Sequence, residues 1–231
     1  MLLAILHLWV LYMTVSVEQI IDAKAHIGTL KNEAHPKTQQ YRADVVNGLV
    51  VIDPESIKKQ LEAAREKIQT AKKEWKQVLV VSEKQMYMKD LEELATKGWF
   101  HYLNHKVPAW FLTNFDTLQK RISTMNELRS FMESEDFESL TKKEQLTHKR
   151  KLAKTERVYK GVTGLKNMPD LVVVVDWQMM TGLIHEIEKK SIDSVVIASS
   201  NFSKFWSSSN LVITNVAGYK GIDFVLKYLL S

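Results

Sequence analysis

The stretch Asn104-His105-Lys106-Val107-Pro108-Ala109-Trp110-Phe111-Leu112-Thr113-Asn114-Phe115 opens a long charged excursion that ends at Asp170. Thr113 or Asn114 suits the N-cap of a helix. Behind this cap, apolar side chains recur at steps of mostly three or four residues, at Phe115, Leu118, Ile122, Met125 and Met132. The spacing is typical of a helix that packs along one seam against a single partner helix.

A second helix is predicted after Thr141, because the acidic residues 133–136 end the first one. Glu144 lies three residues after Thr141, which is the spacing of a capping box. This helix runs to about Tyr159, with few apolar positions and many Lys and Arg side chains. Residues 113–160 are therefore predicted to form an inserted α-helical coiled-coil hairpin with one wet, basic arm.

Short apolar runs alternate with amphipathic stretches on both sides of the hairpin. After a short helix over 17–25 and an irregular basic loop over 26–42, strands are predicted at 48–52, 78–81, 99–103, 171–175, 194–198 and 211–213, and helices at 55–75, 83–97, 179–189 and 222–230. This alternation predicts an α/β fold with a doubly wound, mostly parallel, flavodoxin-like sheet. We assign it residues 13–112 and 161–231. The run at 48–52 is expected to be its first strand, buried on both faces.

The amino-acid composition limits the kinds of partner and site that this protein can have. The 231 residues are 45% hydrophobic, carry a net charge of +5 and contain no cysteine, which excludes disulfides, zinc–thiolate sites and cysteine nucleophiles. The basic excess is compatible with a polyanion. Residues 1–12 are apolar but shorter than the roughly 20 residues of a membrane span, and no basic residue precedes them. We interpret them as an apolar leader or as an artefact of the start site, with Met13 as the true start, and expect no membrane partner.

Signs of catalysis are weak in this sequence. Nucleotide binding in a doubly wound sheet needs glycines in the first strand-to-helix turn, but the turns after Ile52 and Val81 have none. His101 and His105 straddle a predicted strand end, where a spacing of four does not suit a metal. Asp53 and Asp176 are expected to cap helices. We predict no catalytic residue, metal, cofactor or small-molecule substrate.

Several blocks, in this order, resemble the bacterial-type small-subunit ribosomal protein S-two family from about Thr14 to the end. The most specific are Leu112-Thr113-Asn114-Phe115 and Leu140-Thr141-Lys142-Lys143-Glu144, supported by His26-Ile27-Gly28, His35-Pro36-Lys37, Asn104-His105-Lys106, Met168-Pro169-Asp170 and Val174-Val175-Asp176. The resemblance implies a doubly wound sheet with a coiled-coil hairpin. It also implies a non-catalytic structural protein of the small subunit that binds rRNA, supports assembly and translation, and helps seat the S-one protein. The implied location is the cytoplasm, with an organellar ribosome as the alternative.

The candidate rRNA contacts combine the basic loop, the hairpin and its base. They are His26, Lys31, His35, Lys37, Arg42, His105, Lys106, Asn114, Lys120, Arg121, Lys142, Lys143, Lys149 and Arg150. Basic side chains of this kind position a protein on phosphates, but the loop over 26–42 also fits a solvated surface. A small nucleotide-dependent enzyme or a coiled-coil adaptor is the alternative function.

The chain departs from the family pattern at three places, residues 106–111, Ser82-Glu83 in place of Gly-Thr, and residues 214–218 in place of a Pro-Gly-Asn-Asp-like stretch. Where the family has a basic-Trp-Leu-Gly-Gly turn, this chain has residues 106–111, and Trp110 stands at the second glycine. Glycine suits backbone with φ above zero or a close approach of another chain. Either the turn has been rebuilt around Pro108, with Trp110 stacking on rRNA or on the hairpin base, or a reassigned codon read as Trp is translated as Gly.

Overall fold

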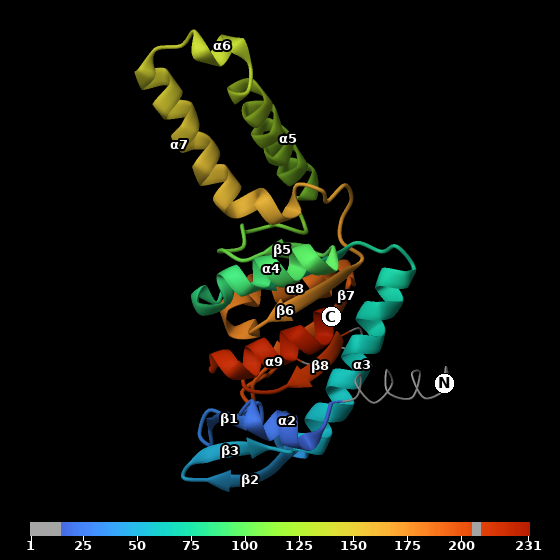
Figure 1. Cartoon of the computed structure of the whole chain (residues 1–231). Coiled ribbons are helices and arrows are strands. Elements are labelled where there is room, and N and C mark those ends of the chain that lie inside the picture. The colour runs from blue at the N-terminus through green and yellow to red at the C-terminus, as the bar shows by residue number, and fades with distance from the viewer. Residues whose placement is uncertain (1–14, 205–208) are drawn as a thin grey trace, which may run out of the picture.

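A helical hairpin projects from one end of an α/β body, and a small separate sheet forms the other end (Figure 1). This computed structural model describes residues 15–204 and 209–231. The predicted leader over 1–12 and the start at Met13 lie outside the described residues. None of the described helices is long and apolar enough to span a bilayer.

The body is built on five parallel strands in the order β5-β4-β6-β7-β8. They are β4 (Val78–Ser82), β5 (His101–Leu103), β6 (Leu171–Val175), β7 (Asp193–Ala198) and β8 (Ser209–Ile213). The chain enters in the middle of this sheet, adds one strand to one side and the remaining three to the other, which is the flavodoxin-like order. Every residue of β4 and β6 is buried, as expected for strands covered on both faces. The doubly wound α/β fold is confirmed.

Helices α3 (Pro54–Lys73), α4 (Met88–Gly98), α8 (Thr181–Lys190) and α9 (Tyr219–Leu230) cover the sheet. Helix α9 contacts both α3 and α4. The crossovers through α4 and α8 run in opposite directions, so right-handed connections place these helices on opposite faces. The turns before α4 and α8 are the 3₁₀ helices η2 (Gln85–Tyr87) and η4 (Trp177–Met180). The predicted inner stripe of α3, from Ile57 to Ala71, is buried, and Asp53 caps this helix.

The prediction for residues 48–52 was wrong in its placement. Strand β3 (Leu49–Ile52) is the centre of a separate antiparallel sheet, between β1 (Ile27–Leu30) and β2 (Arg42–Val46). Val50 and Ile52 are buried while Leu49 is exposed, so the strand has one wet face. A run of four apolar residues hides this alternation, because a strand with one wet face and a strand with two buried faces then read alike.

The N-terminal basic segment is also more regular than predicted. Helix α2 (Val17–Asp22) is capped by Ser16 and is shorter than the predicted 17–25. The loop expected over 26–42 contains β1, the 3₁₀ helix η1 (Pro36–Tyr41) and the first residue of β2. Gly48 and Asn47, both at positive φ, form the tight turn between β2 and β3.

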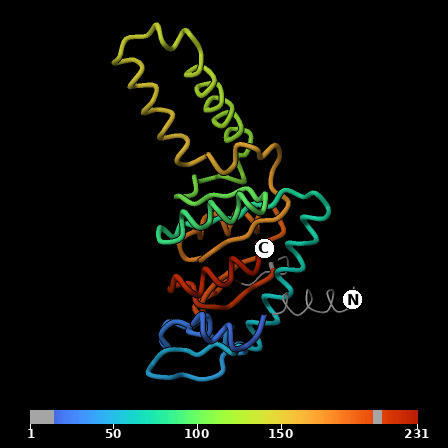
Figure 2. The backbone as a smooth tube through the Cα atoms, in the orientation of Figure 1, coloured from blue at the N-terminus to red at the C-terminus, as the bar shows by residue number. Residues whose placement is uncertain are grey.

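The hairpin consists of α5 (Phe115–Met132), a short α6 (Glu135–Glu138) at the tip and α7 (Lys142–Tyr159), followed by the 3₁₀ helix η3 (Lys160–Val162). The two arms run side by side (Figure 2) and contact each other. The seam predicted for α5 is buried at Leu118, Ile122 and Met125. The capping box of Thr141 and Glu144 is present. True coiled-coil packing, and the division at 113 and 160, stay predictions.

Candidate nucleic-acid interface

A buried carboxylate in the body holds the segment that leads into the hairpin. Oε2 of Glu186, on α8, accepts hydrogen bonds from the backbone N–H groups of Leu112 (2.8 Å) and Thr113 (2.9 Å) and from the Thr113 hydroxyl (3.2 Å). Glu186 is only 8% exposed. Sequence reasoning missed this residue, because it lies 74 positions from Leu112 and a single Glu in an amphipathic helix carries no signal of such a role.

Further contacts fix both ends of the hairpin to the body. Before α5, the Val107 N–H donates to Oε1 of Glu83 at 2.8 Å. After α7, Gly161 approaches Tyr102 of β5 so closely that a Cβ at this position would collide with the Tyr102 carbonyl oxygen and ring. Lys160 pairs with Glu92 of α4 at 2.7 Å. The two segments that connect the hairpin to the body are therefore short, and each is fixed by contacts with the body.

Helix α7 concentrates the positive charge of the protein. It carries seven Lys and Arg against two Glu, a net charge of +5, which equals the net charge of the whole chain. The rest of the sequence is therefore neutral overall. The tip is acidic, since α6 and the residue before Ser134 contribute Glu133, Glu135, Asp136 and Glu138. A polyanion would meet the flank of α7 favourably and the tip unfavourably.

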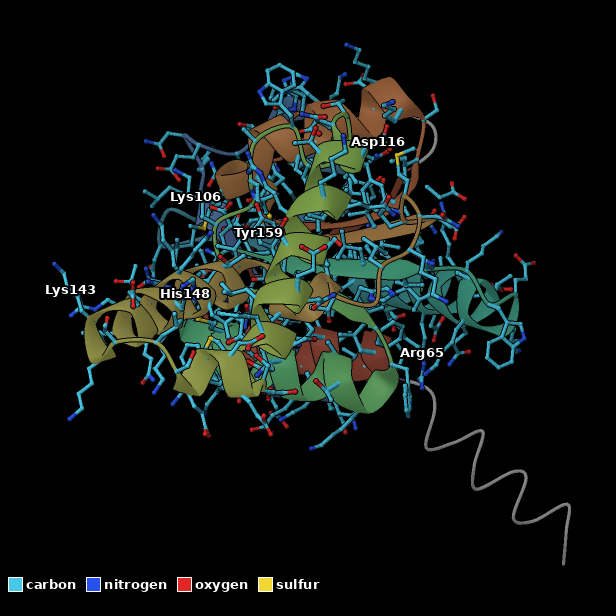
Figure 3. The ribbon with its side chains drawn as sticks, turned by 90° about the horizontal axis from the view of Figure 1, so that it is seen from above. Arg65, Lys106, Asp116, Lys143, His148 and Tyr159 are labelled. Atoms are coloured by element: carbon cyan, nitrogen blue, oxygen red, sulfur yellow. The ribbon has the colours of Figure 1, made fainter. Side chains whose placement is uncertain are left out.

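Two of the predicted contacts on α7, Lys143 and Arg150, face away from the partner arm. Nine residues, about two and a half turns, separate Lys143 from buried Leu152 and Arg150 from buried Tyr159, which puts each pair on opposite sides of the helix. Arg157 follows Arg150 by seven residues, as Arg150 follows Lys143, so the three side chains lie along one side of the helix. Figure 3, seen from above, shows Lys143 at the outer left of the molecule and Tyr159 near the middle. We call Lys143, Arg150 and Arg157 the outer stripe.

Two other predicted residues of α7, Lys142 and Lys149, flank the outer stripe and are exposed. The Lys149 ammonium lies 5.9 Å from the centre of the Phe137 ring. Among the described residues, no ion pair involves any of the four predicted contacts on α7, which are Lys142, Lys143, Lys149 and Arg150. Their charges are thus available to a phosphate.

A groove of about 350 Å³ between the two arms brings together cations from both. Lys120 and Arg121 come from α5, as predicted, and Lys151 comes from α7. The Arg121 guanidinium also lies 3.4 Å from the Tyr159 hydroxyl, to which it donates. Lys151 was absent from the predicted contacts. Its position could have been found by projecting α7 on a helical wheel, but its meeting with Lys120 and Arg121 depends on how the arms pack.

His105 and Lys106 lie at the base of the hairpin. Nε of Arg157 donates to Nε2 of His105 at 3.4 Å, which requires the neutral form of this imidazole. Burial, and secondly the positive charge of Arg157, lower the pKa of His105. Lys106 is exposed. Asn114, at the N-cap position of α5, accepts a hydrogen bond from the Thr117 hydroxyl and none from the helix backbone.

The N-terminal candidates lie at the opposite end of the molecule from the hairpin (Figure 1). Lys31 and Lys37 are exposed. Arg42 instead holds its own segment together, donating to the carbonyl of His35 and the hydroxyl of Thr38. Nδ1 of His26 is buried and has no hydrogen-bond partner among the described residues. The structure therefore divides the predicted contacts into two separate surfaces.

The edge where flavodoxin-like folds bind ligands has a different composition here. This edge lies at the carboxyl ends of β4 and β6, where the strand order reverses. Nζ of Lys84 and Oδ2 of Asp176 form an ion pair of 2.5 Å there, and the Asp176 carboxylate also accepts from the Gln178 N–H. Asp176 thus caps η4, as predicted. Among the described residues, no group of three His, Asp or Glu could hold a metal ion.

Comparison with known proteins agrees with this architecture. The family model described as "Ribosomal protein S2" matches residues 20–229. The small ribosomal subunit protein uS2 of Coprothermobacter proteolyticus is 33% identical over 187 residues, which cover 81% of this chain and 70% of the relative. The corresponding protein of Petrotoga mobilis is 32% identical over 162 residues, 70% of this chain and 56% of the relative. The chain therefore belongs to the ribosomal protein S2 family, whose members are structural, non-catalytic proteins of the small ribosomal subunit.

Proposed function

We propose that this protein binds small-subunit rRNA through the outer stripe of α7 and the cationic groove between the hairpin arms, and that this contact supports subunit assembly. The observation that carries the proposal is that α7 alone holds a net charge equal to that of the whole chain. The family is one of small-subunit ribosomal proteins, so rRNA is the polyanion that this helix would contact.

The chemistry of the interface favours phosphate binding without base recognition. Lys and Arg side chains on an exposed helix reach phosphate oxygens, release condensed counterions and give a strongly salt-dependent affinity. Such contacts orient a protein on RNA but carry little sequence information. Neighbouring rRNA shape, and the two held ends of the hairpin, would then set the position of the protein.

Lys31 and Lys37 provide a second, weaker contact in this proposal, because they are exposed on the separate N-terminal sheet region. The protein would then touch rRNA at both ends of its long axis. Contacts with neighbouring small-subunit proteins, including the S-one protein, would use the surfaces in between, and residues 113–160 would fold as an insertion in one α/β domain. We place the protein in cytoplasmic ribosomes, with organellar ribosomes as the alternative that cell fractionation would reveal.

A charge reversal on the outer stripe tests the proposal. The variant Lys143→Glu/Arg150→Glu removes two phosphate contacts, so the slope of log affinity against log salt should become shallower by about 1.4–1.8. The matched control is Lys73→Glu/Lys97→Glu, a reversal of two exposed Lys in the last turns of α3 and α4. Unchanged circular dichroism would show that both variants fold. Equal rRNA binding by both variants across a salt titration would contradict the proposed interface.

Sedimentation separates the ribosomal role from the coiled-coil adaptor or enzyme alternatives. We expect the wild-type protein to migrate with the small subunit, and the outer-stripe variant to shift towards the free pool. A protein that is found only in the free pool would instead favour an adaptor role. The amount of S-one protein on subunits that lack this chain would test that partnership.

A further inference from the structure

Three tryptophans occupy backbone positions that are typical of glycine, and we infer that the protein made in its own cell carries glycine at positions 75, 99 and 110. Trp75, Trp99 and Trp110 have φ values of 58°, 61° and 63°. Only seven described residues other than glycine have positive φ, and three of them are tryptophan. The described part of the chain contains only one other tryptophan, Trp177. Aromatic residues are rare in this left-handed region, because Cβ crowds the following carbonyl oxygen.

Hydrogen bonds identify two of these positions as the residue just after a helix. At the end of α3, the N–H groups of Trp75 and Lys76 donate to the carbonyls of Lys72 and Ala71. At the end of α4, those of Trp99 and Phe100 donate to Thr96 and Ala95. Both patterns are Schellman motifs, and glycine is the usual residue at the left-handed position of this motif.

Exposure of the three side chains supports the same assignment. Trp75 is 94% exposed, Trp99 91% and Trp110 67%. Tryptophan is highly buried on average, because its large apolar surface gains most from leaving water. A glycine at these positions would expose no such surface. Lys24 and Ser191 also have positive φ after helices, so the conformation alone is not decisive; its combination with an exposed indole is.

Trp177 provides an internal comparison. Its ring lies edge-to-face with Phe202 at 5.4 Å, and its Nε1 donates to Oδ1 of Asn201 at 3.4 Å. It is half-buried in η4 and does not have positive φ. This residue therefore uses both the apolar ring and the polar N–H of tryptophan, and we infer that it is a true tryptophan.

A docking surface made of the three indoles is the competing explanation. Trp75 and Trp99 precede β4 and β5, whereas Trp110 follows β5. In a parallel sheet, the residues before the strands and the residues after them lie at opposite ends of the strands, so one partner could not cover all three indoles. At the hairpin base, glycine in place of Trp110 would also widen the groove of about 460 Å³ that Trp110 lines together with Lys106 and Lys189.

Glycine can stand where the written sequence has Trp only if the codon there is assigned to Trp in conceptual translation but is read by a glycyl-tRNA in the cell. The standard code has a single Trp codon, UGG, and some variant codes also assign the related codon UGA to Trp, so a conceptual translation under such a code writes Trp at every UGA. We therefore expect UGA at positions 75, 99 and 110 and UGG at position 177. The chain would then contain more than the 8 glycines of its present sequence, a count below the usual share of about 7%.

Two measurements on the native material test this inference. Sequencing of the gene should show one codon at the three positions and a different one at Trp177, and mass spectrometry of peptides from native ribosomes should show glycine at 75, 99 and 110. The same codon at all four positions, or tryptophan in the native peptides, would overturn it.

Recombinant variants provide an independent readout. Trp75→Gly, Trp99→Gly and Trp110→Gly should each raise Tm by about 2–4 °C, because each relieves left-handed strain. The matched control Trp177→Gly should lower Tm, because it removes the contacts with Phe202 and Asn201. A fall in Tm for all three of the first variants would show that the indoles belong to the fold, and would count against the inference.

Discussion

Replacing Glu186 with alanine is expected to loosen the base of the hairpin while leaving the sheet intact. The change removes the acceptor of three hydrogen bonds, two of them from backbone N–H groups. Leu112 is 1% exposed, so water cannot replace the lost partner of its N–H group, whereas Thr113 is only partly buried. An unsatisfied buried donor costs about 1–3 kcal/mol. We therefore expect a loss of about 2–4 kcal/mol, a large part of the roughly 5–15 kcal/mol that stabilises a domain.

Urea unfolding measures the global loss, and hydrogen exchange locates it. The Leu112 and Thr113 amides should exchange about 100-fold faster in Glu186→Ala, since each 1.4 kcal/mol is a factor of ten. Glu186→Gln keeps an acceptor oxygen and should lose only about 1 kcal/mol. Glu188→Ala, on the exposed side of the same helix, is the matched control and should change neither quantity. A loss below about 0.5 kcal/mol with unchanged exchange at Leu112 and Thr113 would refute the reasoning.

Three further predictions concern the hairpin and its junction with the body. Burial lowers the pKa of His101, so the folded state favours the neutral imidazole. The stability that this neutral side chain contributes is fully present above the ordinary histidine pKa of about 6.5. It is lost as the pH falls from there through the lowered pKa of the folded state. His101→Gln should therefore lose less stability than wild type between about pH 7.5 and 5.5 in urea unfolding, and equal losses would contradict this. Gly161→Ala should cost about 1–3 kcal/mol, because the new methyl group meets Tyr102; the exposed Gly164→Ala is its control, and equal midpoints would argue against the close approach. Thr141→Ala should cost about 1 kcal/mol and fray the start of α7, through loss of the cap to Glu144, and unchanged amide exchange at Glu144 would disprove that role.

Local signals allowed much of the fold to be predicted. The capping box at Thr141, the apolar stripe of α3 and the Asp53 cap each depend on residues within one or a few helical turns, and all are present in the structure. The alternation of strands and helices likewise predicted the doubly wound sheet. Such patterns can be read directly, because each residue and its partner lie close together in the sequence.

Pairing between distant segments could not be predicted in the same way. Strand β3 looks like a strand of the main sheet but pairs with β1 and β2 in a sheet of its own. The positive φ of Trp75 and Trp99 was not anticipated, because helix ends are the least certain part of a sequence-based assignment. The candidate contacts formed one list in the sequence and two separate surfaces in the structure.

The sequence by itself determined the helical hairpin, the basic character of its second arm and the α/β class, since periodicity, caps and charge are properties of neighbouring residues. Only the tertiary structure decided which cations meet. Lys120, Arg121 and Lys151 share a groove because the arms pack along Leu118, Ile122 and Leu152, and Glu186 holds the hairpin base across 74 positions of sequence. The physical reason is that the energy of these contacts depends on burial and on distances between remote residues, which exist only once the chain has folded.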